Sequence, residues 1–526
     1  MGRYQHIAKH PRPVMSAFRK PTHCQASPAL DSPGFPTTYC VEKIPSRSKD
    51  EALPAALTPS GQVQPMLRAE MGPDRALLVD LYELTMAAAY FEHRVDCRAT
   101  FELFVRHLPA ERAYLVAAGL DSALAYLENL HFSDAKVRFL RAQPPFQTVS
   151  PAFFDYLREF RFHGDVRAVE EGTLVFAEEP LLQVTAPVLE AQIAETYLLS
   201  VMHFETLVAS KAARVVRAAR GRSVLEFGTR RAHGPEAGVR AARAACVGGC
   251  AATSNVLAGA LYDLPLAGTA AHSWTQVFRS ERRSFEALLE TFPDSAILLV
   301  DTYDPLAGAE IAARLGRKVS GVRLDSGDLL GKSQRVREIL DRHGLRDTKI
   351  VASGDLNEYK IEELLGGGAP IDSFGVGTDL VTSRDVPALS VVYKLVETEA
   401  GGVAEPKTKF SEEKVYWPGR KQVFRFSHGG QYHHDLLARK EEDYRQGSPL
   451  LQLVMREGRR LAPPPRVDEI RKRTLANLAC LPEAYQALRA APTYPVEKSA
   501  ALKQLLEEIR VQHFGATKAS HTEGES

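Results

Sequence analysis

Residues 319–328 read Val-Ser-Gly-Val-Arg-Leu-Asp-Ser-Gly-Asp, a short apolar strand pattern that ends in a polar turn. Three nearby stretches repeat this order, at 296–304 (Ala-Ile-Leu-Leu-Val-Asp-Thr-Tyr-Asp), 349–355 (Lys-Ile-Val-Ala-Ser-Gly-Asp) and 371–378 (Ile-Asp-Ser-Phe-Gly-Val-Gly-Thr). Between them lie helical patterns near 306–316, 331–343 and 356–366, and another strand is expected at 223–227. This alternation predicts an α/β fold of parallel strands joined by helical crossovers. Both a barrel and an open doubly wound sheet fit it.

The segments on either side have other patterns. Upstream, we expect a strand at 99–105, short strands within 165–187, and helices through 82–90 and at 119–130, 134–141, 151–159 and 188–217. Downstream, 391–395 and 422–426 have the pattern of antiparallel strands, and helices are expected near 467–488 and 496–511. Residues 1–70 are rich in Pro, Ser and Thr, and the tail 515–526 is polar. We expect both to be disordered because neither can bury a core.

The composition excludes several classes of protein. The chain has 526 residues with 66 Lys and Arg against 65 Asp and Glu, a net charge of +1. That balance gives no general attraction to nucleic acid or to an anionic membrane, and no apolar run reaches the roughly 18 residues of a membrane span. Six cysteines do not make a disulfide framework, so a reducing, cytoplasmic location is expected. We expect Cys246 and Cys250 to be small packed residues rather than zinc ligands.

Polar residues follow each of the four strands at 296–376. Because the active sites of parallel α/β folds lie at the carboxyl ends of the strands, these residues are candidates for a site: Asp301, Arg323, Asp325, Gly354, Asp355, Gly377 and Thr378. These residue types are suited to binding a phosphorylated sugar. Backbone N–H groups at Gly377 and the hydroxyl of Thr378 can meet phosphate oxygens, and the carboxylates can hold ribose hydroxyls or a magnesium-bound diphosphate. Arg323 can hold a substrate carboxylate with two parallel contacts.

Two further clusters carry candidate chemistry. Residues 226–236, Glu-Phe-Gly-Thr-Arg-Arg-Ala-His-Gly-Pro-Glu, place two arginines between glycines after a strand, which suits anion binding. Residues 267–274, Ala-Gly-Thr-Ala-Ala-His-Ser-Trp, place His272 in a run of small residues. A lone histidine of this kind more often satisfies a core or a helix end than performs chemistry. His428, His433 and His434 are expected in a solvated hairpin turn.

These motifs together resemble those of the nicotinate phosphoribosyltransferases. The runs at 226–236, 253–259 (Thr-Ser-Asn-Val-Leu-Ala-Gly), 267–273 and 321–329 match the family in order, as does Gly375-Val-Gly-Thr. Asp80-Leu-Tyr near the start and Tyr393-Lys-Leu near the end fit as well. The resemblance extends over about 77–440.

The resemblance implies an irregular, TIM-like α/β barrel of the type II phosphoribosyltransferases at 216–390. A second α+β domain would combine 71–215 with a C-terminal segment at 391–514. It also implies a homodimer with active sites at the interface. By position in the motifs, His272 is the residue that becomes phosphorylated and Arg230 a catalytic arginine. Tyr82 (from the partner subunit), Ser254, Thr269 and Arg323 are the implied nicotinate contacts. The phosphoribosyl diphosphate contacts are Asp301, Asp325, Gly354, Asp355, Gly377 and Thr378.

The implied reaction joins nicotinate to the anomeric carbon of 5-phosphoribosyl 1-diphosphate, with Mg²⁺ neutralising the leaving group and ATP phosphorylating His272. No metal ligands are assigned. Related nicotinamide enzymes have Asp where Ser254 stands here, and an Asp would repel the carboxylate of nicotinate. The acid is therefore the expected substrate.

Three alternatives remain. The chain could be a nicotinamide phosphoribosyltransferase, which a substrate comparison would reveal. It could be an aldolase or lyase on the same fold, which would need a Schiff-base lysine or a metal cluster at a strand end, where neither Lys349 nor Lys394 is expected. It could be a binding protein without activity, which should have lost one of His272, Arg230, Arg323 or Asp325.

Overall fold

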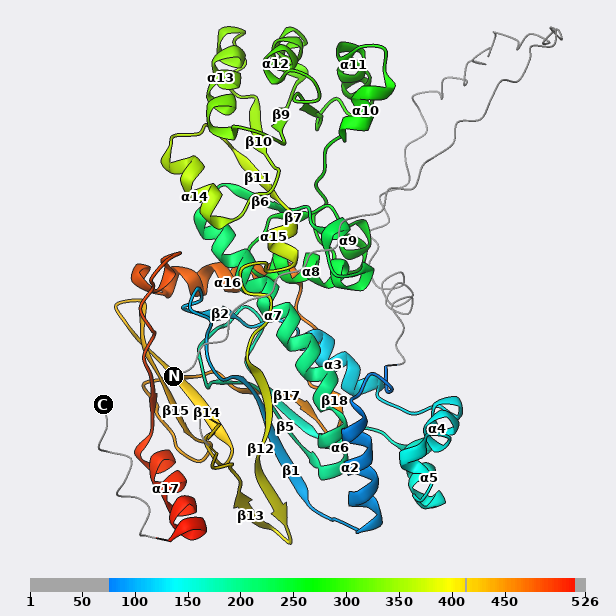
Figure 1. Ribbon diagram of the computed structural model, residues 1–526. Helices are drawn as coiled ribbons and strands as arrows, with labels where there is room; N and C mark the ends of the chain where they lie inside the picture. Colours follow the sequence, from blue (N-terminus) through cyan, green and yellow to red (C-terminus); the bar gives the residue numbers. More distant parts are fainter. Residues whose placement is uncertain (1–74, 412–413, 516–526) are drawn as a thin grey trace, which may run out of the picture. The chain divides into compact units, whose positions relative to one another are not determined.

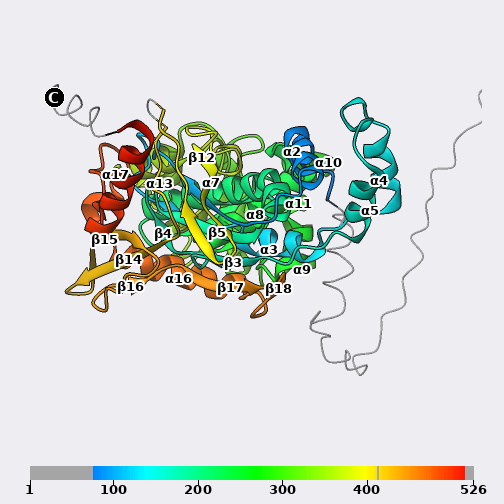
Figure 2. The same ribbon diagram turned by 90° about the horizontal axis from the view of Figure 1, so that it is seen from below.

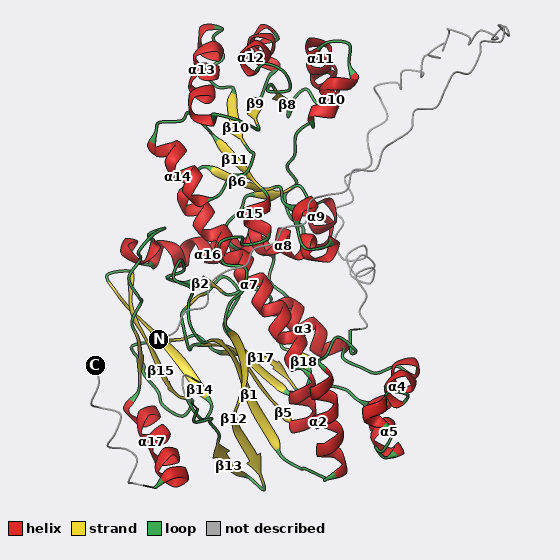
Figure 3. Ribbon diagram, in the orientation of Figure 1, coloured by secondary structure: helices red, strands yellow, loops and turns green. Residues whose placement is uncertain are grey.

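The computed structural model describes residues 75–411 and 414–515, and the predicted disordered segments lie outside these residues apart from residue 515. The middle of the chain forms a sheet of six parallel strands in the order β7-β6-β11-β10-β9-β8 (Figures 1 and 3). The strands are β6 (Ser223–Glu226), β7 (Ala252–Thr253), β8 (Ile297–Leu299), β9 (Gly321–Leu324), β10 (Lys349–Ala352) and β11 (Ser373–Val376). The predicted α/β class with a parallel sheet is therefore confirmed, with six strands rather than the eight of a regular barrel.

The strands of this sheet form because they are buried on both faces. Leu298, Val322, Ile350 and Phe374 are fully buried at successive strands, and crossover helices separate them as in other parallel sheets. These helices are α11 (Glu281–Thr291), α12 (Pro305–Arg314), α13 (Leu329–Arg342) and α14 (Glu358–Gly366). The short α15 (Thr378–Val381) follows β11, the last strand of the sheet along the chain. In the pairing, Arg323 of β9 lies opposite Leu299 of β8 and Val351 of β10. The polar turns after these strands therefore share one edge of the sheet.

A second sheet combines both ends of the described chain. Its seven strands run in the order β13-β12-β1-β5-β3-β17-β18 and all neighbours are antiparallel. They are β1 (Arg98–Val105), β3 (Asp165–Ala168), β5 (Pro180–Pro187), β12 (Val391–Ala400), β13 (Val403–Pro406), β17 (Gln452–Arg456) and β18 (Arg459–Arg460). Strand β1 pairs with β12 from Arg98 opposite Glu399 to Val105 opposite Val391. The expected joining of upstream and downstream segments is present in this sheet.

Smaller sheets and helices complete the chain. A four-stranded sheet has the order β16-β14-β15-β19, and β2 pairs with β4. These strands are β2 (Leu115–Val116), β4 (Leu174–Val175), β14 (Lys421–His428), β15 (Gln431–Arg439), β16 (Ser448–Pro449) and β19 (Val496–Lys498). The remaining helices are α2 (Leu81–Glu92), α3 (Leu120–Asn129), α4 (Asp134–Arg141), α5 (Pro151–Glu159), α6 (Val188–Ile193), α7 (Glu195–Ala218), α8 (Pro235–Val247), α9 (Val256–Tyr262), α10 (His272–Val277), α16 (Val467–Cys480) and α17 (Ala500–Phe514).

Helix α7 connects two separate hydrophobic cores. Its first half, with Leu198 and Val201, packs in the core of the seven-stranded sheet. Its second half, with Val208 and Ala212, packs in the core of the parallel sheet, where α8 lies beside it in both views (Figures 1 and 2). Two cores joined by one 24-residue helix make the two-part arrangement that the sequence suggested. In the described part of the chain no helix is long and apolar enough to cross a membrane.

Three predicted helices differ from the structure. The helix expected at 188–217 is divided at Ala194, which ends α6 and precedes α7. The helix expected at 467–488 ends at Cys480, before Pro482, whose ring cannot continue a helix. The helix expected from 496 starts at Ala500, because 496–498 form β19 and pair with β15. In the last two cases a local helical pattern extended past a boundary that a proline or a distant strand determines.

Candidate active site

The polar turns at the strand ends divide into residues that begin helices and residues that do not. Asp304, Asp328 and Asn357 cap α12, α13 and α14, because their side chains accept hydrogen bonds from backbone N–H groups in the first turn. Asp301 and Asp325 have no such structural duty. The capping explanation therefore accounts for part of the polar pattern and leaves a second set of residues facing the strand ends.

Arg323 links three segments at this edge. Its Nη1 donates to Thr269 Oγ1 at 2.6 Å, its Nε to Ser353 Oγ at 2.7 Å, and its Nη2 to Asp325 Oδ1 at 2.6 Å. Thr269 precedes α10, while Ser353 follows β10, so one guanidinium fixes the ends of two strands and a loop. Of the five N–H groups of an arginine, three are used in these short contacts. Thr269 also borders a cavity of about 780 Å³ beside α11.

Asp325 and Asp301 form the acidic part of the site. The backbone N–H of Asp325 donates to Asp301 Oδ2 at 2.7 Å. Burial alone would raise the pKa of Asp325, but the hydroxyl of Ser353 and the charge of Arg323 outweigh it, so the pKa lies below its ordinary value. Asp301 is 9% exposed and its Oδ1 has no hydrogen-bond partner. Asp325 is therefore ionised at neutral pH, and Asp301 has an oxygen available to a ligand.

His272 is the first residue of α10, and its ring lies next to Thr302 and Asp325. Its Nδ1 lies 3.2 Å from Thr302 Oγ1, and its Nε2 lies 3.8 Å from Asp325 Oδ2. Its side chain is 39% exposed, so it is not the satisfied core residue that its local sequence alone favours. The histidine is held by one hydroxyl and lies near an ionised acid, with access to solvent.

Gly354 and Gly377 allow close approach of backbone at the site. Gly354 has φ +95°, and a Cβ there would lie 1.8 Å from the carbonyl oxygen of Asp325, so no larger residue fits without movement. A Cβ at Gly377 would lie 3.2 Å from the carbonyl oxygen of Phe227. Asp355 has φ 46° and its carbonyl accepts from Lys360, while Thr378 begins α15. The four residues lie in two adjacent turns, after β10 and β11.

The loop after β6 borders the same edge. Arg230 is exposed in a short turn over Thr229–Arg231 and forms no ion pair with another described residue. Ser254 is exposed after β7 and its N–H donates to the carbonyl of Glu226. The structure thus places both residues at strand ends of the same sheet, with Arg230 free to meet an anion.

The structure adds residues that the sequence did not single out. The ring of Phe227 lies 6.0 Å from the Arg323 guanidinium and packs against Gly375. Ser353 joins Arg323 to Asp325, and Lys332 Nζ donates to the carbonyl of Ser326 at 2.9 Å. Phe227 stands one residue after a strand, which was the available signal. Serine is common in loops and lysine is common in helices, so the sequence contained no signal for Ser353 or Lys332.

Tyr82 lies elsewhere, at the start of α2. Burial raises its pKa, followed by the effect of Glu195, and among the described residues no hydrogen bond joins it to Arg323 or Thr269. Burial raises the pKa of Glu195, and the positive charge of Lys394 opposes this shift. Lys394 borders a basic pocket of about 340 Å³, lined by Arg106, Val392, Lys394, Lys409, Lys414 and Tyr416. Tyr82 and this basic pocket therefore both lie near Glu195. All three lie apart from the strand-end cluster in sequence.

A parallel sheet with an arginine, two carboxylates and a histidine at its carboxyl edge defines an α/β enzyme that acts on anionic substrates. Three family models match the chain: the nicotinate phosphoribosyltransferase N-terminal domain at 77–203, the nicotinate phosphoribosyltransferase family at 223–413 and the C-terminal domain at 443–506. The chain belongs to the nicotinate phosphoribosyltransferase family.

Known relatives agree over most of their length. The chain is 45% identical to nicotinate phosphoribosyltransferase pncB2 of Mycobacterium tuberculosis, over 81% of this chain and 91% of the relative. It is 38% identical to the nicotinate phosphoribosyltransferase of Bacillus subtilis, over 81% and 93%. The crystal structure of human nicotinic acid phosphoribosyltransferase has a TM-score of 0.72 at 31% identity, covering 82% of this chain and 99% of that one.

Proposed function

We propose that this member of the family transfers a phosphoribosyl group from 5-phosphoribosyl 1-diphosphate to nicotinate and couples the transfer to ATP through phosphorylation of His272. The observation that carries the proposal is the cluster around Arg323, in which Thr269, Asp325 and His272 lie within one network of contacts. The proposal gives Arg323 the role of binding the substrate carboxylate, Asp325 that of binding ribose and His272 that of the nucleophile.

Nicotinate has a carboxylate on an aromatic ring, and the site has a partner for each part. Besides its three short contacts, Arg323 donates from Nη1 to the carbonyl of Ala270 at 3.4 Å. If the substrate replaces this long contact, two N–H groups can hold a carboxylate in a charge-assisted pair. The ring of Phe227, beside the same guanidinium, offers an aromatic face for stacking. Ser254 brings no negative charge to repel the acid, which favours nicotinate over nicotinamide.

The transfer itself breaks the bond between the anomeric carbon and the diphosphate oxygen and forms a bond from that carbon to the pyridine nitrogen. Positive charge develops on the ribose as the diphosphate leaves, so ionised Asp325 would favour the transition state. Arg230 would meet the phosphates, and Gly377 and Thr378 would hold the 5-phosphate with N–H and hydroxyl groups. The chain's main contribution is to position two reactants and to balance their charges.

His272 has the surroundings of a phosphate acceptor. A histidine nitrogen attacks the γ-phosphorus of ATP, ADP leaves, and a phosphohistidine forms. Thr302 fixes the ring through Nδ1. Once phosphorylated, the side chain would repel Asp325, 3.8 Å away, which gives a physical route for the modification to alter how Asp325 and Arg323 hold their substrates.

Magnesium fits the carboxylates at this edge. The unpartnered Oδ1 of Asp301 is an oxygen ligand of the kind that Mg²⁺ prefers. Among residues 75–411 and 414–515, no three metal-binding side chains come together. Substrate phosphates would therefore have to complete the coordination, and the ion would neutralise charge on the leaving diphosphate.

We also propose a homodimer in which each active site uses both chains. If Tyr82 reaches the nicotinate site of a partner, Lys394 and its basic pocket come with it, since both neighbour Glu195. Within the described residues Arg106, Lys394, Lys409 and Lys414 form no ion pairs, which leaves their charges available. A pocket with this lining suits phosphate groups, and the partner site is where phosphates are expected.

The test is product formation from nicotinate or nicotinamide, each with 5-phosphoribosyl 1-diphosphate and magnesium, with and without ATP. We expect nicotinate mononucleotide, stimulation by ATP, and loss of that stimulation in His272→Ala. The exposed hairpin variant His433→Ala should retain it. If only nicotinamide reacts, the argument from Ser254 is wrong. If ATP stimulates His272→Ala as it does the unaltered chain, the phosphohistidine proposal is wrong.

A further inference from the structure

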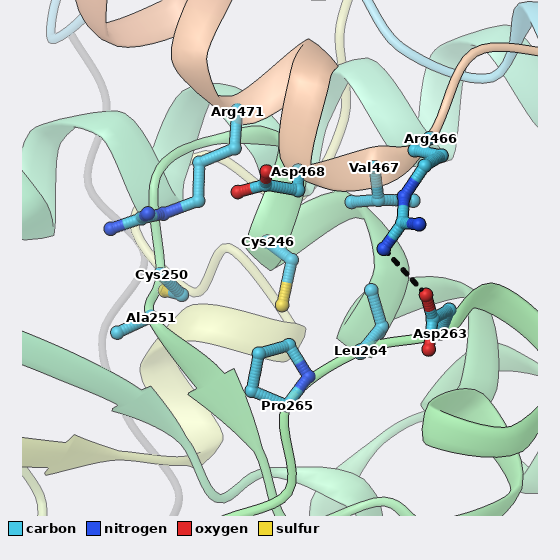
Figure 4. Close-up of a pocket in the computed structure, with 10 residues that line it drawn as sticks. All are labelled: Cys246, Cys250, Ala251, Asp263, Leu264, Pro265, Arg466, Val467, Asp468 and Arg471. Atoms are coloured by element: carbon cyan, nitrogen blue, oxygen red, sulfur yellow. Dashed lines mark hydrogen bonds and ion pairs between the residues drawn. The ribbon is translucent and has the colours of Figure 1, made fainter. Parts of the chain in front are cut away.

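A cavity of about 350 Å³ lies between the end of α8 and the start of α16 (Figure 4). Its walls come from the end of α8, the segment before β7, the segment after α9 and the first turns of α16. The lining residues are Cys246, Cys250, Ala251, Asp263, Leu264, Pro265, Arg466, Val467, Asp468 and Arg471. At about 30 Å³ for each water-sized group, this volume suits roughly a dozen non-hydrogen atoms.

The two thiols in the apolar part of the lining are buried and neutral. Cys246 and Cys250 are both buried, and burial raises the pKa of Cys246 to about 12 and that of Cys250 well above its ordinary value. Both thiols are therefore uncharged at neutral pH. Together with Leu264, Pro265 and Val467 they give the cavity a surface suited to a short hydrocarbon or aromatic body.

One cation of the charged lining forms no ion pair within the described residues, although its charge adds to that of Lys472 in lowering the pKa of Asp468. Arg466 pairs with Asp263 at 2.7 Å, on the opposite side of the cavity from Arg471 (Figure 4). Asp468 pairs with Lys472 at 2.7 Å. Arg471 donates from Nε to the carbonyl of Gly249 at 3.0 Å and forms no ion pair with a described residue. That contact fixes the guanidinium, and its two terminal nitrogens remain available to an anion.

The cavity also adjoins the segment that leads into the active site. The N–H of Thr253 donates to the carbonyl of Pro265 at 3.0 Å, and the N–H of Ala267 donates to the carbonyl of Thr253 at 2.9 Å. Ser254 directly follows Thr253, and Thr269 lies two residues after Ala267. A molecule that packs on Leu264 and Pro265 would therefore rest against the backbone that positions both predicted nicotinate contacts.

We propose that this cavity is a second ligand site, which binds a small amphipathic monoanion through Arg471 and steadies the 253–269 segment when it is filled. The ligand has one carboxylate and an apolar body of roughly seven to nine atoms, by the volume above. The site lies outside the strand-end cluster, and its occupant does not need to be a reactant. Through the paired segment, its binding and that of nicotinate would be coupled reciprocally.

Octanoate is a suitable probe, because it has the right size and charge and no pyridine-like ring to enter the active site. Its binding to the full chain would be measured by calorimetry, with the neutral octanamide for comparison. We expect Arg471→Gln to weaken octanoate about tenfold, as the loss of one charge-assisted contact does. Arg346→Gln, which removes an exposed arginine elsewhere, should have no effect, and Ala251→Leu should abolish binding by filling the cavity.

Hydrogen exchange provides the second measurement and needs no activity. We expect octanoate to slow exchange of the amides of Thr253 and Ala267 in the unaltered chain, and not in Ala251→Leu. Equal affinity of octanoate for Arg471→Gln and the unaltered chain would overturn the proposal, and so would equal affinity for octanamide. Unchanged exchange at 253–269 under saturating octanoate would refute the steadying effect.

Discussion

Arg323 shows how a single side chain organises the site. It stands within β9 and reaches the turn after β10, the loop before α10 and the acid two residues further along. Its planar group of donors suits this arrangement, since each contact uses a different nitrogen. A lysine would keep the positive charge and lose the fixed directions.

Arg323→Lys should therefore weaken nicotinate more than phosphoribosyl diphosphate. We expect kcat/KM for nicotinate to fall by about 100-fold, as for the loss of two charge-assisted contacts, with a smaller change for the other substrate. Steady-state kinetics with each substrate varied would measure this, and Arg335→Lys, an exposed change on α13, would serve as control. An unchanged KM and kcat for nicotinate in Arg323→Lys would remove Arg323 from the binding site.

Gly354 is the residue at which backbone geometry is most restrictive. Gly354→Ala adds a methyl group 1.8 Å from the carbonyl oxygen of Asp325 at a φ of +95°. Gly316→Ala is a matched control, because φ is +80° there and nothing lies within 4 Å. We expect urea unfolding to show a loss of about 1 kcal/mol for Gly316→Ala and about 3 kcal/mol for Gly354→Ala. Equal losses would mean that the turn can move aside.

The residues at the strand ends were largely predictable, and their relations were not. A polar residue after an apolar strand is visible in sequence, which identified Asp301, Arg323 and Asp325. Whether such a residue caps a helix or faces the site depends on its rotamer, so Asp304 and Asp301 could not be distinguished. Ser353 and Phe227 belong to the site only because they contact Arg323 on another strand. One sequence does not show which residues of different strands lie side by side.

Among the elements, α2 is held by a buried acid. Glu83 is fully buried, its carboxylate accepts hydrogen bonds from the N–H and hydroxyl of Thr196 in α7, and its other oxygen has no partner. Burial raises its pKa from 4.5 to about 8, and this outweighs the opposing hydrogen bonds to Thr196. The folded chain therefore holds a proton on Glu83 that the unfolded chain releases near pH 4.5.

This proton makes stability depend on pH with a definite sign. Because the folded pKa is the higher one, the free energy of unfolding should fall as pH rises from about 4.5 to 8. Glu83→Gln should remove this slope and be more stable at pH 8.5 by about 2 kcal/mol. Urea unfolding at several pH values would measure it. Glu92→Gln, at the exposed end of α2, should keep the slope of the unaltered chain, and a slope retained in Glu83→Gln would refute the assignment.

Element prediction succeeded where the signal was local. The strands of the parallel sheet near residues 297, 321, 349 and 373 are apolar runs between helical patterns, and each lies where it was expected. Strand β7 has two residues and no periodicity, and exists because Thr253 pairs with its neighbours. The strand at 496–498 is decided by β15, about 60 residues earlier in sequence. Such long-range pairing overrides a helical pattern and is not visible locally.

At the scale of the whole molecule, shared active sites have a measurable signature. In a symmetric dimer, a chain with Arg323→Ala and a chain with Tyr82→Ala would each lack one part of every site. Mixed dimers would contain one site with both parts intact. Random mixing after unfolding and refolding should therefore restore about a quarter of the unaltered activity. No recovery, with mixed dimers demonstrated by two affinity tags, would mean that each chain supplies its own tyrosine.

The seven-stranded sheet also determines when the protein can fold. The pairing of β1 with β12 joins Arg98 to Glu399, so β1 has no partner on that side until some three hundred further residues have been synthesised. Such high contact order makes folding slow, and a growing chain on the ribosome must keep the apolar edge of β1 covered in the meantime. The parallel sheet, whose strands are close in sequence, can form first. The protein is thus expected to depend on chaperones during synthesis.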